Sequence, residues 1–299
     1  MFFYKYKDTL YSKNQLEFFR IGIAAFSILS LIFLLLDYSA ILHPDGIINW
    51  ELSSANSYLF EFHLKTISDI SGIKPNIILN TSIIIYFITL IFLLIGIYTK
   101  YSSILSFIFY VVINNITSSF CYGVDIYQGV SLFLMCIFPI GYSISFKKKQ
   151  VTSNIEDIKK ICIRVLQIYL IITYTSAGWE KIVQKNWWNG SFMYMVISDS
   201  TLSTISNYAN VFGVKFYKFI SHSILVFESF YFIAIWIPYL RVMWFTGIII
   251  IHLYIILFLS MPFFGLIMII LNFVCWYPHV FHDVNCLIKK NEKNIHIIF

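Results

Sequence analysis

Charged residues are scarce in this sequence, and that scarcity decides the class of protein. Only 12% of the 299 residues are Asp, Glu, Lys or Arg, against roughly 25% in typical soluble domains, whereas 59% are hydrophobic. So large an apolar fraction excludes a cytosolic enzyme, a disordered chain and a nucleic-acid-binding protein. The net charge of +6 is no nucleic-acid patch, because the basic residues fall at the ends of apolar runs.

Cysteine is also sparse, and no cysteine or histidine pattern indicates a disulfide framework or a metal centre. The five cysteines include no Cys-x-x-Cys pair, and only Cys121 falls near the predicted outer face. The sequence has no His-Glu-x-x-His motif and no serine- or cysteine-protease signature. We therefore expect no metal site, and we expect any action on a peptide to be modification, folding or hand-over.

Eight apolar runs account for most of the chain. A membrane-crossing helix needs about 20 mainly apolar residues. We therefore predict an all-α integral membrane protein, a single domain over residues 1–299 that forms a polytopic bundle of about eight transmembrane helices. The predicted spans cover residues 18–40, 77–98, 102–121, 126–146, 161–180, 216–238, 242–261 and 263–280.

The basic residues orient these spans. Of the 21 Lys and Arg residues, fifteen lie on the side that carries both termini and six lie on the opposite side. The positive-inside rule therefore predicts that both termini are cytoplasmic. The six basic residues on the outer side are Lys65, Lys74, Lys181, Lys185, Lys215 and Lys218.

Two long segments, residues 41–76 and 181–215, fall on the predicted outer face. Their half-apolar stretches YLFEFHLKTI and WWNGSFMYMVI are too short and too polar to cross the membrane. We expect interfacial or re-entrant helices that fold back over the spans, with Trp187 and Trp188 at headgroup depth.

Few polar groups lie inside the predicted spans, and these are the candidate functional residues. An ionisable side chain there costs roughly 2.5 to 3.5 kcal/mol and persists only with a partner or a function. Glu228 and His252 lie in the middle of consecutive spans, where they would form a buried pair, either in a functional cavity or as a structural contact. Helix–helix hydrogen bonding or interfacial anchoring are the alternative roles of the other polar residues. These are Arg20, Asn114, Asn115, Asp125 and Asn272.

The end of the fifth predicted span carries the most specific pattern in the chain. It contains Tyr174, Gly178, Glu180, Lys181, Trp187 or Trp188, and Gly190. A tyrosine, a glycine, a basic residue, a tryptophan and a glycine in this order resemble the HTTM family of membrane proteins, which includes the vitamin K-dependent gamma-carboxylases. Arg20, the tract DIYQGVSLFLMCIFPIGYSIS and the late stretch FESFYFIAIWIPYLRVMWFTGIIIIHLYIILFLSMPFFGLIMII resemble its sporulation-delaying toxin-maturation branch in particular. The resemblance covers about residues 15 to 280.

The resemblance implies a bacterial plasma-membrane protein that matures a secreted peptide-toxin precursor at the outer face, together with a small soluble or peripheral partner protein. In the carboxylases, the lysine that matches Lys181 deprotonates vitamin K hydroquinone, so the resemblance suggests a quinone or vitamin K-like lipid as cofactor. The carboxylases also have a large lumenal domain, whereas this chain ends about 19 residues after its last predicted span. The matching position in the toxin branch tolerates arginine, which cannot act as this base.

We therefore expect maturation of a toxin precursor. A quinone-dependent, carboxylase-like enzyme and a non-catalytic immunity or scaffold protein are the alternatives. Lys181, Glu228 and His252 are the predicted catalytic residues and face one cavity, and an interfacial ion pair between Lys181 and Glu180 is the structural alternative. The predicted substrate-binding residues are Arg20, Asn114, Asn115, Asp125, Glu180, Trp187 and Gly190. The expected partners are the precursor peptide, the small partner protein and the lipid bilayer.

Overall fold

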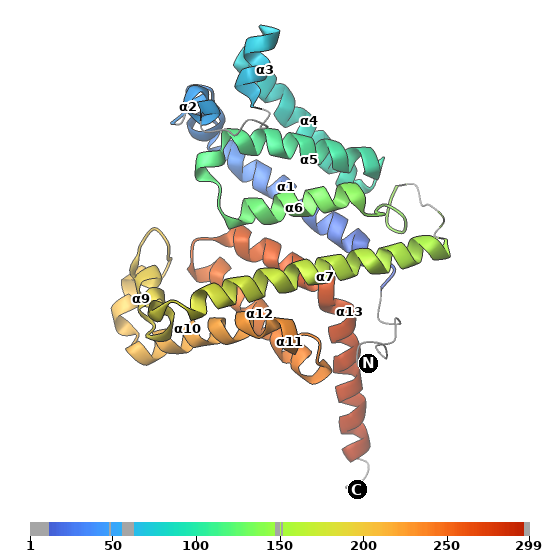
Figure 1. Ribbon diagram of the computed structural model, residues 1–299, viewed down its shortest axis with the longest axis vertical. Helices are drawn as coiled ribbons and strands as arrows, with labels where there is room; N and C mark the ends of the chain where they lie inside the picture. Colours follow the sequence, from blue (N-terminus) through green and yellow to red (C-terminus); the bar gives the residue numbers. More distant parts are fainter. Residues whose placement is uncertain (1–11, 48, 56–62, 147–149, 151, 296–299) are drawn as a thin grey trace. The chain divides into compact units, whose positions relative to one another are not determined.

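The fold is helical throughout the residues that the structure, a computed structural model, describes: 12–47, 49–55, 63–146, 150 and 152–295. Five of its helices are long and apolar enough to cross a membrane. They are α1 (Gln15–Leu36), α4 (Pro75–Ile95), α7 (Ser153–Ile182), α12 (Pro238–Phe258) and α13 (Pro262–Ile295). By helix length and hydropathy, the protein is a multi-pass membrane protein, as its composition predicts (Figure 1).

The other three predicted spans also contain helices, but these helices are not among the five. They are α5 (Thr99–Ile116), α6 (Gly123–Ile137) and α10 (Val214–Ser229). α6 is shorter than its apolar run because Phe138 precedes Pro139, and the residue before a proline disfavours the helical conformation. Phe138 is accordingly extended, with ψ of 148°.

The sixth predicted span is wrong as one continuous helix over residues 216–238. α10 ends at Ser229, the chain leaves the helix at Phe230, and the short helix α11 (Tyr231–Ala234) follows. Pro238 then opens α12, where a proline at the first helical position sacrifices no intrahelical hydrogen bond. The predicted hairpin of the last two spans is confirmed, because α12 and α13 pack along each other and only residues 259–261 separate them.

Both long segments of the predicted outer face contain short helices, as expected. The first holds the π-helical turn η3 (Tyr38–Leu42), α2 (Trp50–Ala55) and α3 (Leu64–Ser71), while residues 48 and 56–62 lie outside the described residues. The second holds α8 (Lys185–Trp188), α9 (Ser191–Ser198) and the 3-10 helix η5 (Ser206–Val211). Their depth relative to the lipid headgroups stays a prediction.

Contacts divide the chain into two compact units. The N-terminal unit comprises residues 16–159, and the C-terminal unit comprises residues 160–299 with the segment up to Gln15. In the N-terminal unit, α4, α5 and α6 pack in sequence order (Figure 1). A buried polar contact joins α6 to α1 and α4, because the Gln128 amide donates to Ser27 Oγ at 3.0 Å and to Tyr86 Oη at 3.4 Å.

In the C-terminal unit, the segment that contains α8, α9 and η5 folds onto α10. Its apolar side chains form a core with residues of α10 and of the end of α12. The backbone amide of Thr204 also donates to Phe258 O at 3.0 Å, which fixes this segment to the end of α12. The buried members of this core are Trp187, Met193, Val196, Ile197, Ala209, Tyr217, Ile224, Leu225 and Leu259.

Candidate functional site at Lys181, Glu228 and His252

Gly178 brings the backbones of α7 and α10 into contact. A Cβ atom at residue 178 would lie 2.5 Å from the backbone nitrogen of Ser229 and 2.8 Å from the carbonyl carbon of Glu228. Side-chain carbons do not approach a backbone this closely, so only glycine fits. Lys181 follows Gly178 by three residues and therefore lies on the same face of α7, opposite Glu228.

Lys181 and Glu228 form an ion pair at this helix crossing. Lys181 Nζ lies 2.6 Å from Glu228 Oε2, and the two side chains are 21% and 13% exposed. Nζ also donates to Ala177 O at 3.3 Å and lies 5.4 Å from the centre of the Trp187 ring. Glu180 is exposed, so the alternative in which Lys181 pairs with Glu180 is wrong.

A buried polar network lies on the same face of α7. Tyr174 Oη lies 2.7 Å from His252 Nε2 of α12 and accepts a hydrogen bond from Asn272 Nδ2 of α13 at 2.6 Å. Tyr231 Oη donates to Asn272 Oδ1 at 2.9 Å. All four side chains are buried, so the network joins α7, α11, α12 and α13.

One ring nitrogen of His252 takes part in this network. His252 Nε2 pairs with the Tyr174 hydroxyl, whose oxygen can accept a second hydrogen bond besides the one from Asn272, so either partner can be the donor. His252 Nδ1 is buried and has no hydrogen-bond partner among the described residues.

The network and the ion pair are neighbours along α7. Tyr174 and Lys181 are seven residues apart, which is two helical turns, or about 10 Å along the helix axis. The predicted direct pair of Glu228 with His252 is wrong, because Glu228 bonds to Lys181 and His252 bonds to Tyr174. All three predicted catalytic residues thus lie in the C-terminal unit. Lys181 is on α7, and Glu228 and His252 contact the same face of α7, Glu228 through Lys181 and His252 through Tyr174.

Trp187 and Gly190 fix the segment after α7. Trp187 is 6% exposed and stacks on Phe192 with ring centres 4.4 Å apart, so it packs inside the protein, and its depth relative to the headgroups stays a prediction. Trp188 is 51% exposed. Gly190 has φ of 79°, which favours glycine, and a Cβ there would lie 2.8 Å from the Lys218 nitrogen of α10. Both residues therefore hold α8 and α9 against α10.

Three predicted substrate-binding residues, Asn114, Asn115 and Asp125, belong to the N-terminal unit and have local contacts there. Asp125 accepts a hydrogen bond from the Tyr122 amide at 2.9 Å and so caps α6. Asn114 Oδ1 lies 3.3 Å from Cys121 Sγ, and Asn115 is buried. These contacts give Asn114 and Asp125 a role in the turn between α5 and α6.

Arg20 is a structural residue of the N-terminal unit. Its side chain is fully buried and pairs with the equally buried Glu17 at 3.0 Å, so the alternative of an interfacial anchor is wrong. The guanidinium also donates to the carbonyls of Leu93, Leu94 and Ile144. These bonds hold the end of α4 and the segment after α6 to α1, and they offer no support for the predicted contact with a substrate.

Sequence reasoning missed several partners of these residues. Glu17 had a signal, since it precedes Arg20 by three residues and so shares its helix face. Arg241 Nη1 lies 2.6 Å from Asp283 Oδ2 in a second buried ion pair, and Tyr231 completes the polar network. Neither contact has a local signal, because each joins residues about forty positions apart.

Within the described residues, no three or more His, Cys, Asp or Glu side chains gather to hold a metal ion. Comparison of the chain with family models, with curated proteins and with solved structures gives no match.

Proposed function

We propose that this protein matures the precursor of a secreted peptide toxin at the outer face of a bacterial plasma membrane, with a small soluble or peripheral partner protein. The resemblance to the HTTM family supports this function. The convergence of the resembling residues in the C-terminal unit supports it further, because each contacts a neighbouring element there. They are Tyr174, Gly178, Lys181, Trp187 and Gly190.

The Lys181–Glu228 pair is the observation that carries the proposal. Two ions withdrawn from water lose hydration, and a well-packed apolar pair of similar size often stabilises a fold as well. A role in stability alone therefore does not explain why the crossing of α7 and α10 contains both charges. An ammonium fixed by a carboxylate can donate to a carbonyl or carboxylate of a bound peptide. We assign this role to Lys181, positioned by Glu228.

A quinone-dependent enzyme on the carboxylase plan is the second candidate function. It requires Lys181 as a base, and the ion pair weighs against that role, because an ammonium has no lone pair with which to take a proton. A bound quinone would supply the redox chemistry in such an enzyme. The two candidates differ in what they require at position 181, a cation or a free amine.

Intact-mass spectrometry of secreted peptides tests the proposal. Cells with and without this gene should secrete a peptide that differs in mass, processing or disulfide state. Lys181→Met should reproduce the deletion at wild-type membrane abundance, whereas Lys215→Met, at an exposed lysine of the predicted outer side, should not. Identical secreted peptides in all four strains would refute a maturation function.

A further inference from the structure

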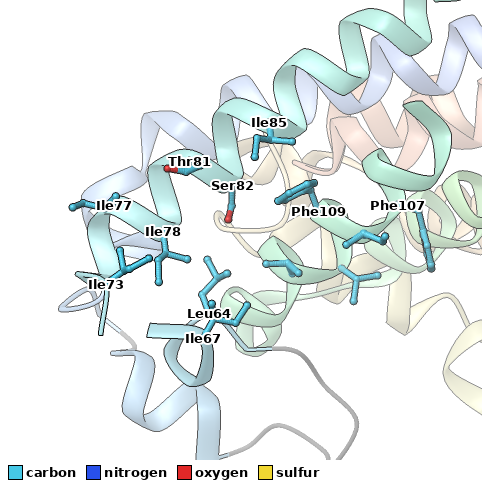
Figure 2. Close-up of a pocket in the computed structure, with 13 residues that line it drawn as sticks. Leu64, Ile67, Ile73, Ile77, Ile78, Thr81, Ser82, Ile85, Phe107 and Phe109 are labelled. Atoms are coloured by element: carbon cyan, nitrogen blue, oxygen red, sulfur yellow. The ribbon is translucent and has the colours of Figure 1, made fainter. Parts of the chain in front are cut away.

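A groove with a volume of about 720 Å³ lies in the N-terminal unit between α3, α4 and α5. Figure 2 shows Ile78 and Ser82 of α4 pointing into it, with Leu64 and Ile67 of α3 facing them. Its size falls within the range of roughly 300 to 1,000 Å³ that is usual for ligand pockets. None of the predicted site residues lines it.

The lining of the groove selects an apolar occupant. Among its lining residues, all of which the structure describes, the only polar side chains are those of Thr81 and Ser82, and none is charged. A buried water needs two to four polar partners, and cavities lined by Leu, Ile and Phe stay dry. This lining therefore suits an apolar ligand better than ordered water.

The wall formed by α3 is fixed by hydrogen bonds at both of its ends. His63 Nδ1 accepts from the Lys65 amide at 3.1 Å, and His63 Nε2 lies 2.8 Å from Ser53 Oγ of α2. At the other end, Gly72 has φ of 68°, and Ser68 Oγ donates to Ile73 O at 2.7 Å. The groove is thus preformed, which lowers the entropic cost of ordering an occupant.

The position of the groove indicates which hydrocarbon it meets. α4 is long and apolar enough to cross a membrane, so we expect a groove along it to face lipid chains. Lys65 directly follows the lining residue Leu64 at the start of α3, and Lys74 directly follows the lining residue Ile73 beyond the end of α3. Lys65 Nζ is 3.7 Å from Glu51 and 32% exposed, and Lys74 is exposed.

We propose that this groove binds one acyl chain of an anionic glycerophospholipid, whose phosphate lies beside Lys65 and Lys74. The apolar groove takes the chain, and the ammonium groups of the two lysines next to its lining residues attract the phosphate. An ordinary annular lipid contacts any apolar helix face, whereas this site combines a preformed groove with two cations. The inference does not depend on the proposed maturation function.

Photocrosslinking tests this site on the full chain. The protein is reconstituted in phosphatidylcholine vesicles that contain a small fraction of phosphatidylglycerol with a diazirine in one acyl chain. After irradiation, mass spectrometry should find labels on Ile78 and Val112 at about ten times the level on Ile84 and Ile88. Ile84 and Ile88 are the matched lipid-facing positions of α4, at 58% and 44% exposure. Equal labelling of the two faces would show annular lipid only and would overturn the proposal.

Variants and competitors sharpen the same experiment. Ile78→Trp and Ile85→Trp both fill the groove, and either should lower its labelling about fivefold, while Ile84→Trp should leave it unchanged. Unlabelled phosphatidylglycerol should compete better than phosphatidylcholine, and replacing Lys65 and Lys74 by Gln should remove this preference. Displacement by a prenylquinone or an acylated peptide, but not by phosphatidylglycerol, would contradict a phospholipid occupant. The wild-type labelling map decides the question even where a variant does not fold.

Discussion

The buried charges of this protein have two different roles at the scale of single residues. Arg20 and Glu17 are fully buried, and their charged groups bond to each other and to backbone groups of the N-terminal unit. Lys181 and Glu228 are paired more tightly but keep about a fifth and an eighth of their side-chain surface exposed. The first pair therefore serves the fold, and the second remains accessible to a ligand.

We expect Arg20→Met to destabilise the protein by about 3 to 5 kcal/mol, because it leaves the Glu17 carboxylate buried without its cation. Thermal unfolding of the purified variant in detergent, together with membrane abundance, measures this loss. Lys74→Met, at an exposed lysine, is the control and should unfold like the wild type. A wild-type melting temperature for Arg20→Met would contradict the structural role.

The Tyr174 hydroxyl is the centre of the buried polar network. Tyr174→Phe removes the partner of His252 Nε2 and one of the two acceptors of Asn272 Nδ2, which keeps Met268 O, and an unsatisfied buried polar group costs about 1 to 3 kcal/mol. We expect a lower unfolding temperature for this variant. Tyr208→Phe, at a tyrosine that is 61% exposed, should change it little. Equal stability of the two variants would argue against a network held by this hydroxyl.

At the scale of helices, Gly178 decides how closely α7 and α10 pack. Gly178→Ala would place a methyl group 2.5 Å from the Ser229 nitrogen, so the helices must separate. We expect a loss of about 1 to 3 kcal/mol in stability. The separation should also weaken the Lys181–Glu228 pair and with it the maturation of the client.

Gly213→Ala is the matched control for this prediction. A Cβ at residue 213 meets no atom within 4 Å, and its φ of −79° suits any residue. This variant should keep both stability and maturation. If Gly178→Ala behaved in the same way, close packing of α7 and α10 would not be needed for function.

The sequence predicts where helices form better than where they end or which side chains they bring together. Each of the eight apolar runs contains a helix, and the two half-apolar stretches overlap α3 and α9, because hydrophobicity is a local property. The break after Ser229 has no proline or glycine to announce it, so it was missed. The Lys181–Glu228 contact depends on a helix crossing at Gly178, and the packing of distant segments cannot be read from local spacing. Polar residues within spans nevertheless identified Glu228 and His252.

At the scale of the whole molecule, the number of membrane crossings sets the sidedness of the termini. Eight crossings place both termini on one side, whereas five place them on opposite sides. The structure shows five helices long and apolar enough to cross, so the eight-span arrangement with cytoplasmic termini, in which fifteen of the 21 basic residues lie on the side of the termini, stays a prediction. It requires α5, α6 and α10 to cross the membrane as well.

Topology reporters test this orientation. Fusions after Lys149, which lies outside the described residues, and after Lys290 should report cytoplasm, and a fusion after Lys74 should report the exterior. An exterior signal after Lys290 would mean an odd number of crossings. An exterior signal after Lys149 would overturn the assignment of the first four spans.

The most direct test of the proposed function is the intact mass of the secreted client peptide from strains that carry Lys181→Arg and Lys181→Met. Arginine keeps the positive charge and the hydrogen bond to Glu228 but cannot act as a base, whereas methionine keeps neither. If Lys181 acts as a cation, the arginine strain should secrete the mature client and the methionine strain should secrete it at about a tenth of the wild-type level or less. Loss of the mature client in both strains, at wild-type abundance of both variants, would contradict this account and favour a lysine base.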